Sequence, residues 1–76
     1  MKLYWPSAII QDSDNKRPWL RSTSQGEISL EKAMMIINYF KDNHTVLSAW
    51  VDSFDECNNK QTVFHECYID AFGNVY

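Results

Sequence analysis

Apolar residues between positions 29 and 42 recur at the three- and four-residue spacing of an amphipathic helix. The repeat consists of Leu30, Ala33, Met34, Ile37 and Phe40. Ser29 is a common N-cap residue, and Glu31 places a negative charge in the first turn, where the helix dipole favours it. We therefore predict a helix from Ser29 to about Asp42, with Asn43 as a left-handed cap at its end.

Three further apolar residues, Met35, Ile36 and Tyr39, widen the apolar stripe of this helix. A wide stripe is typical of a helix that is more buried than an ordinary surface helix. We expect these three side chains to lie in or near the core.

Short runs of β-branched and aromatic residues, bounded by turn residues, predict strands in the rest of the chain. The predicted strands cover 2–11, 45–54 and 62–71, and a fourth, for which a structured loop is the alternative, covers 17–24. Pro6 lacks an N–H, so we expect the first strand at a sheet edge or bent there. Turns are expected at 12–16, 55–61 and 72–74.

These elements predict an α+β fold in a single domain spanning residues 1–76. The fold is a small antiparallel sheet of three to four strands with one helix packed on one face, in the order β-(β)-α-β-β. A chain of 76 residues buries a modest core and is expected to have modest stability.

The register of the hairpin between strands 45–54 and 62–71 decides which side chains share a face. We favour an odd-length loop, which places an aliphatic set under the helix: Leu47, Ala49, Val51, Val63, Cys67 and Ile69. The opposite face then gathers aromatic residues with carboxylates between them: Trp50, Phe54, Phe64 and Tyr68, with Asp52, Glu66 and Asp70. A tight turn at Asn58-Asn59 would instead put Trp50 and Phe54 on the face of Cys67.

The net charge of −3 and the pI of about 5.1 argue against a protein that binds the phosphate backbone of nucleic acids. No apolar run reaches the length of a transmembrane helix, and no secretory signal is visible. We therefore expect a cytoplasmic protein without membrane contact. Its two cysteines, Cys57 and Cys67, are then expected to be reduced.

His65, Glu66 and Cys67 are adjacent in sequence and raise the question of a metal site or a nucleophile. Successive strand residues point to opposite faces, so Glu66 cannot converge with its neighbours. No zinc-ligand spacing is present. We expect Cys67 to be a small buried residue facing the helix, out of hydrogen-bonding reach of a His65 at the core edge. The prediction is therefore no metal, no cofactor and no enzymatic activity.

Three tryptophans, four tyrosines and four phenylalanines are many for so short a chain. One helix covers only one sheet face, so aromatic residues on the other face lie under the N-terminal segment, with Tyr4, Trp5 and Trp19, or are exposed. They can simply stabilise the sheet through cross-strand pairs. An exposed aromatic patch, by contrast, is typical of an interaction site.

We accordingly predict a small non-catalytic protein-interaction module, of the kind found among bacterial or phage accessory proteins. It would bind a partner protein or a second copy of itself through an aromatic face with an acidic rim: Trp50, Asp52, Phe54, Phe64, Glu66 and Tyr68. One alternative is single-stranded nucleic-acid binding through the same aromatic residues, although the carboxylates would repel phosphates. A second is a metal- or thiol-dependent site at His65 and Cys67.

Overall fold

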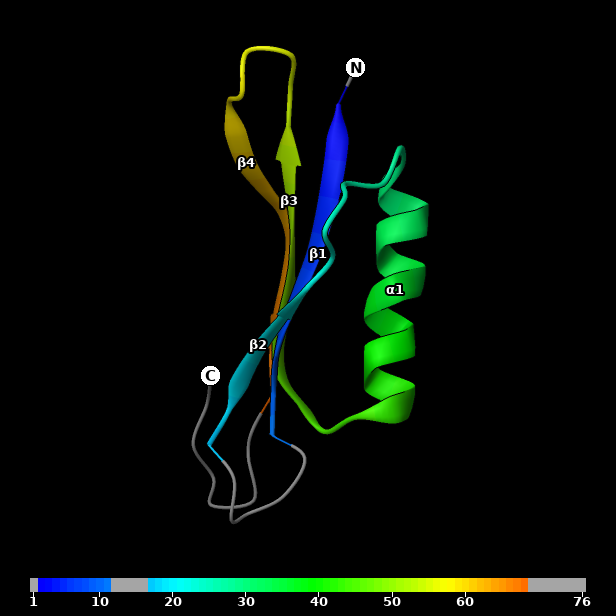
Figure 1. Ribbon diagram of the computed structural model, residues 1–76, viewed down its shortest axis with the longest axis vertical. Coiled ribbons are helices and arrows are strands. Elements are labelled where there is room, and N and C mark those ends of the chain that lie inside the picture. Colours follow the sequence, from blue (N-terminus) through cyan, green and yellow to red (C-terminus); the bar gives the residue numbers. More distant parts are fainter. Residues whose placement is uncertain (1, 12–16, 69–76) are drawn as a thin grey trace.

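The computed structural model describes residues 2–11 and 17–68, which form one four-stranded antiparallel sheet with a helix on one face (Figure 1). In chain order the elements are β1 (Leu3–Ile10), β2 (Trp19–Ser22), α1 (Leu30–Asn43), β3 (Val46–Phe54) and β4 (Lys60–Cys67). The sheet order is β2-β1-β3-β4. The predicted α+β fold is confirmed, including its fourth strand. The turns expected at 12–16 and 72–74, and residues 69–71, lie outside the described residues.

Helix α1 begins where the sequence predicts, because the Ser29 side chain accepts a hydrogen bond of 3.2 Å from the Lys32 N–H. Its end differs from the prediction. Asn43 is the last helical residue, and its side-chain amide donates to the Tyr39 carbonyl at 2.8 Å. The cap is His44, in extended backbone, with its N–H donating to the Phe40 carbonyl at 2.8 Å. The expected left-handed cap at Asn43 is therefore wrong.

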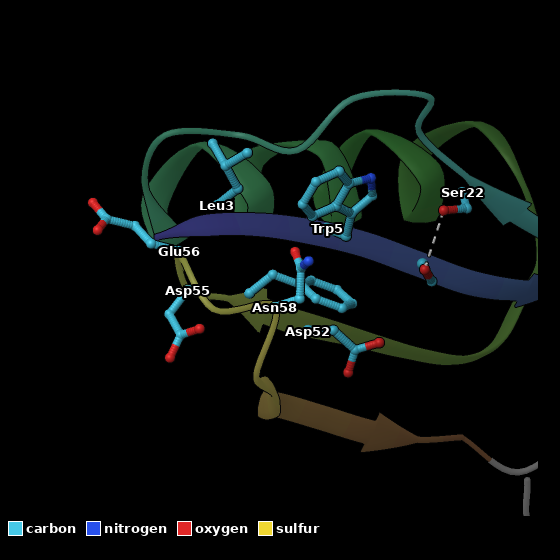
Figure 2. A pocket seen from close by; sticks show the side chains of 9 residues that line it. Leu3, Trp5, Ser22, Asp52, Asp55, Glu56 and Asn58 are labelled. Carbon is cyan, nitrogen blue, oxygen red and sulfur yellow. Dashed lines mark hydrogen bonds between the residues drawn. The ribbon is translucent and has the colours of Figure 1, made fainter. Parts of the chain in front are cut away.

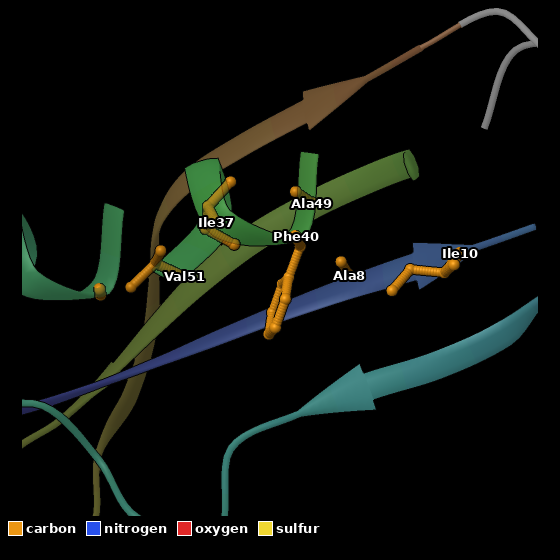
Figure 3. Close-up of a cluster of buried hydrophobic side chains, with 7 residues drawn as sticks. Ala8, Ile10, Ile37, Phe40, Ala49 and Val51 are labelled. Carbon is orange, nitrogen blue, oxygen red and sulfur yellow. The ribbon is translucent and has the colours of Figure 1, made fainter. Parts of the chain in front are cut away.

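One side of α1 packs on β1 and β3 and forms the core (Figure 3). The buried cluster consists of Ala8, Ile10, Ala33, Ile37, Phe40, Ala49 and Val51. Alanines on the sheet leave room for the larger helix side chains, such as Ile37 and Phe40. Burial of each large apolar side chain contributes roughly 1.5–3 kcal/mol, so this cluster holds the helix on the sheet.

The wide apolar stripe expected on α1 is only partly buried. Met34 and Ile36 pack against the core cluster. Met35 and Tyr39 instead remain 65% and 60% exposed, so their predicted burial is wrong. The helix touches one sheet face only, and no other described element covers its outer side.

Strand β1 is an inner strand, so the edge position expected from Pro6 is wrong. Pro6 pairs with Val51 of β3. On the other side of β1, β2 pairs only with residues 7–10, and Tyr4 exchanges backbone hydrogen bonds with Glu27. Backbone groups of alternate residues point to the same neighbour. The nitrogen of Pro6 therefore faces the stretch between these two contacts, where a missing N–H costs little.

The register between β3 and β4 changes part-way along the hairpin. Next to the loop, Phe54 pairs with Lys60 and Asp52 with Thr62, as the favoured odd-loop register requires. A β-bulge at Val63 then shifts the pairing by one residue, so that Trp50 pairs with His65. A shift of one residue moves every later side chain of β4 to the other face. Beyond the bulge the favoured register is therefore wrong.

We call the sheet face opposite α1 the open face. Cross-strand pairing assigns to it Leu3, Trp5, Ser7, Ile9, Leu20, Ser22, Ser48, Trp50, Asp52, Phe54, Lys60, Thr62, His65 and Cys67. Within the described residues no helix or strand packs on it. Strand β1 lies beside β3 and β2 lies beside β1, so both N-terminal strands belong to the sheet and form no second layer over the open face (Figure 1).

Candidate functional site

The residues predicted to bind a partner lie on two different faces. Trp50, Asp52 and Phe54 are on the open face. Phe64 packs against the helix-side core, and Glu66 pairs with Ala49 on that same side. The bulge at Val63 is the physical reason for the separation, and the predicted single cluster is wrong in this respect.

Tyr68 and Glu66 belong to a contact between the sheet and the end of α1. The Tyr68 hydroxyl donates a hydrogen bond of 2.8 Å to the Glu66 carboxylate. The Lys41 ammonium lies 5.1 Å from the centre of the Tyr68 ring, within cation–π range. Burial, followed by the bond to Glu66, raises the pKa of Tyr68, and the Tyr68 hydroxyl raises the pKa of Lys41. These residues join helix to sheet.

The open face is hollowed where β1 and β3 approach the loop after β3 (Figure 2). The groove has a volume of about 590 Å³ and is lined by Leu3, Trp5, Ser7, Ser22, Asp52, Phe54, Asp55, Glu56 and Asn58. The Trp5 and Phe54 rings meet edge to face, with centroids 5.3 Å apart and planes at 81°. This is a favourable aromatic geometry, and it gives the groove one apolar wall.

The Trp5 ring is held in place by the loop before α1. A Cβ atom at Gly26 would lie 2.6 Å from Cζ3 of Trp5 and 2.8 Å from Cβ of Leu3, so any larger residue would force the ring or the loop to move. Next to it, Glu27 and Tyr4 exchange backbone hydrogen bonds of 2.7 and 2.8 Å. The bridge fixes the loop against β1, and the loop in turn fixes the indole.

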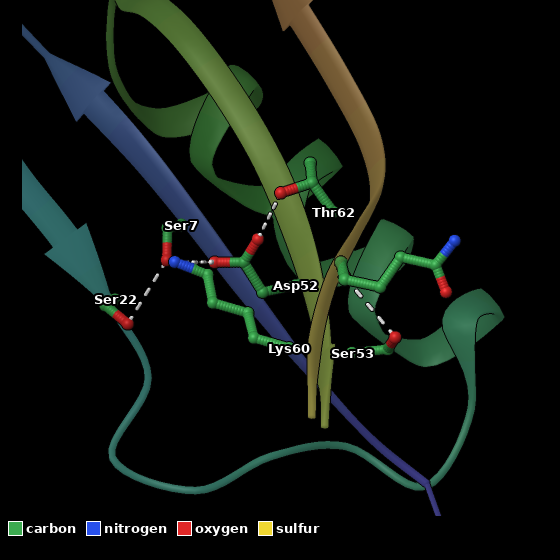
Figure 4. A network of polar contacts seen from close by, with 7 residues as sticks. Ser7, Ser22, Asp52, Ser53, Lys60 and Thr62 are labelled. Atoms are coloured by element: carbon green, nitrogen blue, oxygen red, sulfur yellow. Dashed lines mark hydrogen bonds and ion pairs between the residues drawn. The ribbon is translucent and has the colours of Figure 1, made fainter. Parts of the chain in front are cut away.

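Asp52 supplies a nearly buried carboxylate to the groove, since the residue is only 8% exposed. The Thr62 hydroxyl donates to its Oδ1 at 2.8 Å, and the Lys60 ammonium lies 3.8 Å from its Oδ2 (Figure 4). A buried charge needs such partners to offset the loss of water. The Ser7 hydroxyl, which also lines the groove, donates to the Ser22 oxygen at 3.4 Å.

Asp55 forms the turn at one end of the groove. Its carboxylate accepts hydrogen bonds of 2.9 Å from the N–H groups of Asn59 and Cys57, and one of 3.2 Å from the Asn59 amide. These bonds, those from Asn59 first, lower the pKa of Asp55. Asn58 completes the turn with a φ of 60°, in the left-handed region that asparagine tolerates. Asp55 therefore stays negatively charged through ordinary pH.

His65 and Cys67 are exposed on the open face, in the outer strand β4. The expectation that Cys67 is buried under the helix is wrong, because the bulge turns it outward. Its Sγ lies 3.5 Å from Nε2 of His65, within reach of a sulfur hydrogen bond, so the expected separation of the pair is also wrong. The described residues hold no group of three or more His, Cys, Asp or Glu side chains arranged for a metal ion.

Sequence reasoning missed the part of the site that β1, β2 and the loops contribute, most importantly Trp5 and Gly26. The buried residues Pro6 and Ala8 set the helix-facing parity of β1. The same alternation puts Trp5 on the opposite face, and it can be recognised from the sequence of β1. The role of Gly26 depends on the path of its loop, which strand patterns do not reveal.

Comparison with protein-family models, with curated proteins and with solved structures gave no significant match. Within the described residues, α1 lacks the length and apolar content that a membrane crossing requires.

Proposed function

We propose that this protein is a small non-catalytic interaction module that binds another protein through its open face. The partner is either a distinct protein or a second copy of the chain. The observation that supports this most directly is the group of half-buried aromatic side chains on a sheet face that no other described element covers: Trp5, Trp50 and Phe54.

Trp50 has the position of an interface anchor. It lies on the inner strand β3, directly opposite Ser7 on one side and His65 on the other. Both neighbours are smaller than an indole, so part of the ring stays accessible. Leu20, on the same face, is 59% exposed. Large aromatic side chains at the centre of a patch commonly contribute most of the binding energy.

The charge of the groove favours a protein partner over a nucleic acid. Aromatic rings on a sheet can stack bases, but Asp52, Asp55 and Glu56 line the groove beside these rings. Nucleic-acid affinity comes mainly from cations that neutralise phosphates. The carboxylates instead suit a partner with a basic surface, for which they would raise the rate and selectivity of association.

We do not assign a catalytic role to the contact between Cys67 and His65. A cysteine nucleophile requires a base that a third group orients and a site that encloses the substrate. Both residues are exposed on an outer strand. A cytoplasmic accessory role, with both cysteines reduced, completes the proposal, and both thiols are free.

The test replaces Trp50 by alanine and compares it with Tyr39→Ala, which removes an exposed aromatic side chain from α1. Binding is followed by sedimentation velocity of the pure protein over a concentration series, and by retention of proteins from an extract of the source cells. We expect Trp50→Ala to weaken self-association or partner retention at least about tenfold, as truncation of a central tryptophan commonly does. Tyr39→Ala should have no effect. Unchanged binding by folded Trp50→Ala protein would refute the proposal.

A further inference from the structure

We infer that the groove on the open face binds an arginine side chain of the partner, with the guanidinium between the Trp5–Phe54 wall and the Asp52 carboxylate. This inference rests on the proposed function and specifies the chemistry that the partner must present. It follows from the polarity of the groove, the cation already held by Asp52, and the geometry of the aromatic wall.

The groove presents hydrogen-bond acceptors and negative charge to its ligand. Its lining includes three carboxylate residues and two serine hydroxyls, and no lysine, arginine or histidine stands among the described lining residues. Asp55 keeps its charge because turn N–H groups bind it. A cationic ligand is therefore complementary to the groove, whereas a carboxylate or phosphate would be repelled.

Asp52 already holds a cation, which shows that its position accepts one. Lys60 reaches it from β4 with a separation of 3.8 Å, and the Lys60 side chain is 60% exposed. That distance exceeds a direct hydrogen bond, so the ion pair is loose. Thr62 occupies the other carboxylate oxygen at 2.8 Å and holds the group in place. A better-oriented cation from a partner can displace Lys60 at little cost.

The aromatic wall favours arginine over lysine. A guanidinium is planar, stacks on aromatic rings and donates several hydrogen bonds in a fixed plane, whereas an ammonium is a compact, strongly hydrated charge. Trp5 of β1 lies directly across from Asp52 of β3 (Figure 2). The Phe54 ring meets the indole of Trp5 edge to face and completes the wall. Gly26 packs on the indole and fixes it before any ligand arrives, which reduces the entropy lost on binding.

The serine pair offers further acceptors to the guanidinium. The Ser7 hydroxyl donates a hydrogen bond to the Ser22 oxygen, so the Ser7 oxygen keeps its lone pairs to accept from an N–H donor. Ser7 is only 7% exposed and lies directly across from Trp50. An arginine that reaches this depth would meet acceptors from both β1 and β3.

The experiment titrates the ¹⁵N-labelled full chain with the blocked tripeptide Gly-Arg-Gly and follows the indole N–H signal of Trp5. The matched ligand carries citrulline, which has almost the same shape but no charge, and a second carries lysine. We expect a saturable shift with arginine, a weaker one with lysine and none with citrulline. Equal shifts with arginine and citrulline, or no saturable shift at millimolar peptide, would overturn the inference.

Two variants with opposite expected effects make the test specific. Asp52→Asn keeps an acceptor for Thr62 but removes the charge, and should weaken arginine binding about tenfold, since a hydrogen bond between charged groups is lost. Lys60→Gln removes the competing cation and should strengthen it. Asp42→Asn makes the same charge change on the exposed side of α1 and should leave binding unchanged. Equal weakening by Asp52→Asn and Asp42→Asn would show only a general charge effect and overturn the inference.

Failure of this inference is distinguishable from failure of the proposed function. If the arginine peptide does not bind but Trp50→Ala still abolishes partner binding, the open face is the interface and the groove inference is wrong. If the peptide binds as expected while Trp50→Ala leaves partner binding unchanged, the groove recognises arginine and the proposed open-face interface is wrong.

Discussion

The Thr62 hydroxyl donates a 2.8 Å hydrogen bond to the Asp52 carboxylate, and these two residues are the last pair before the bulge at Val63. The pair thus stands where the hairpin changes register. It holds the one nearly buried carboxylate of the described residues in the groove, while the bulge turns His65 and Cys67 onto the same face as Trp50. One backbone irregularity therefore sets the composition of the open face.

The first prediction concerns this pair. Thr62→Val removes the donor but keeps the shape, and should lower the free energy of unfolding by about 1–2 kcal/mol, because a hydrogen bond to a charged group is lost. Urea denaturation measures the change. Thr45→Val, at an exposed position before β3, is the matched control and should change stability by less than about 0.5 kcal/mol. Equal stability of the two variants would show that the Thr62–Asp52 bond contributes nothing.

The second prediction concerns the loop that fixes Trp5. Gly26→Ala would place a Cβ 2.6 Å from the indole, so ring or loop must move, at a cost of about 1–3 kcal/mol. Thermal unfolding and the Trp5 indole signal report the change. Ser24→Ala, in the same loop and exposed, should alter neither. A Gly26→Ala protein with wild-type stability and an unmoved Trp5 signal would contradict the packing described.

The third prediction concerns pH. The pKa of Asp55 is lowered in the folded protein from its ordinary value of 3.8, so its charge stabilises the fold above that value, and the contribution is lost as the pH falls through the lowered pKa. Asp55→Asn should therefore be less stable than wild type at neutral pH, with the difference shrinking under strong acid. Urea denaturation across pH measures it. A difference that grew on acidification would mean that the pKa is raised instead.

The fourth prediction separates the two sides of α1. Ile37, which is 1% exposed, faces the sheet, and Ile37→Ala should cost about 2–5 kcal/mol through lost burial and a cavity. Met35, which is 65% exposed, is the control, and Met35→Ala should change stability by less than about 0.5 kcal/mol. Chemical denaturation of both variants tests which side of α1 faces the sheet. A larger loss of stability in Met35→Ala than in Ile37→Ala would mean that the helix is rotated about its axis.

The fold was largely predictable from sequence because its signals are local. Helical spacing and the cap at Ser29 located α1, and runs of β-branched and aromatic residues located the strands. The outer side of α1 was harder, because Met35 and Tyr39 fit an apolar stripe whether or not anything covers them. Pro6 was misleading because β1 is an inner strand that lacks a second neighbour only beside Pro6. Strand β2 ends opposite Ser7 and does not extend to Pro6.

The candidate site was less predictable because it depends on register and on a loop path. Strand parity correctly placed Asp52 on the face of Thr62 near the loop, whereas Lys60 and Gln61, expected in the turn, belong to β4. The extra residue at Val63 reversed the predicted face of every later side chain in β4. No residue type in β4 predicts a bulge at this position. Trp50, Asp52 and Phe54 were grouped correctly. The parity of β1 indicates the face of Trp5, whereas the role of Gly26 depends on the three-dimensional path of its loop.

Site-specific photo-crosslinking from the open face tests most directly whether that face is the interface. A photoreactive amino acid is placed at the position of Leu20, which is 59% exposed on that face, or of Met35 on the outer side of α1. Each protein is irradiated alone and in an extract of the source cells. We expect an adduct with a second protein or second copy from position 20, lost when Trp50→Ala is added, and none from position 35. Adducts from position 35 alone, or adducts from position 20 that persist in Trp50→Ala, would contradict the assignment of the open face as the interface.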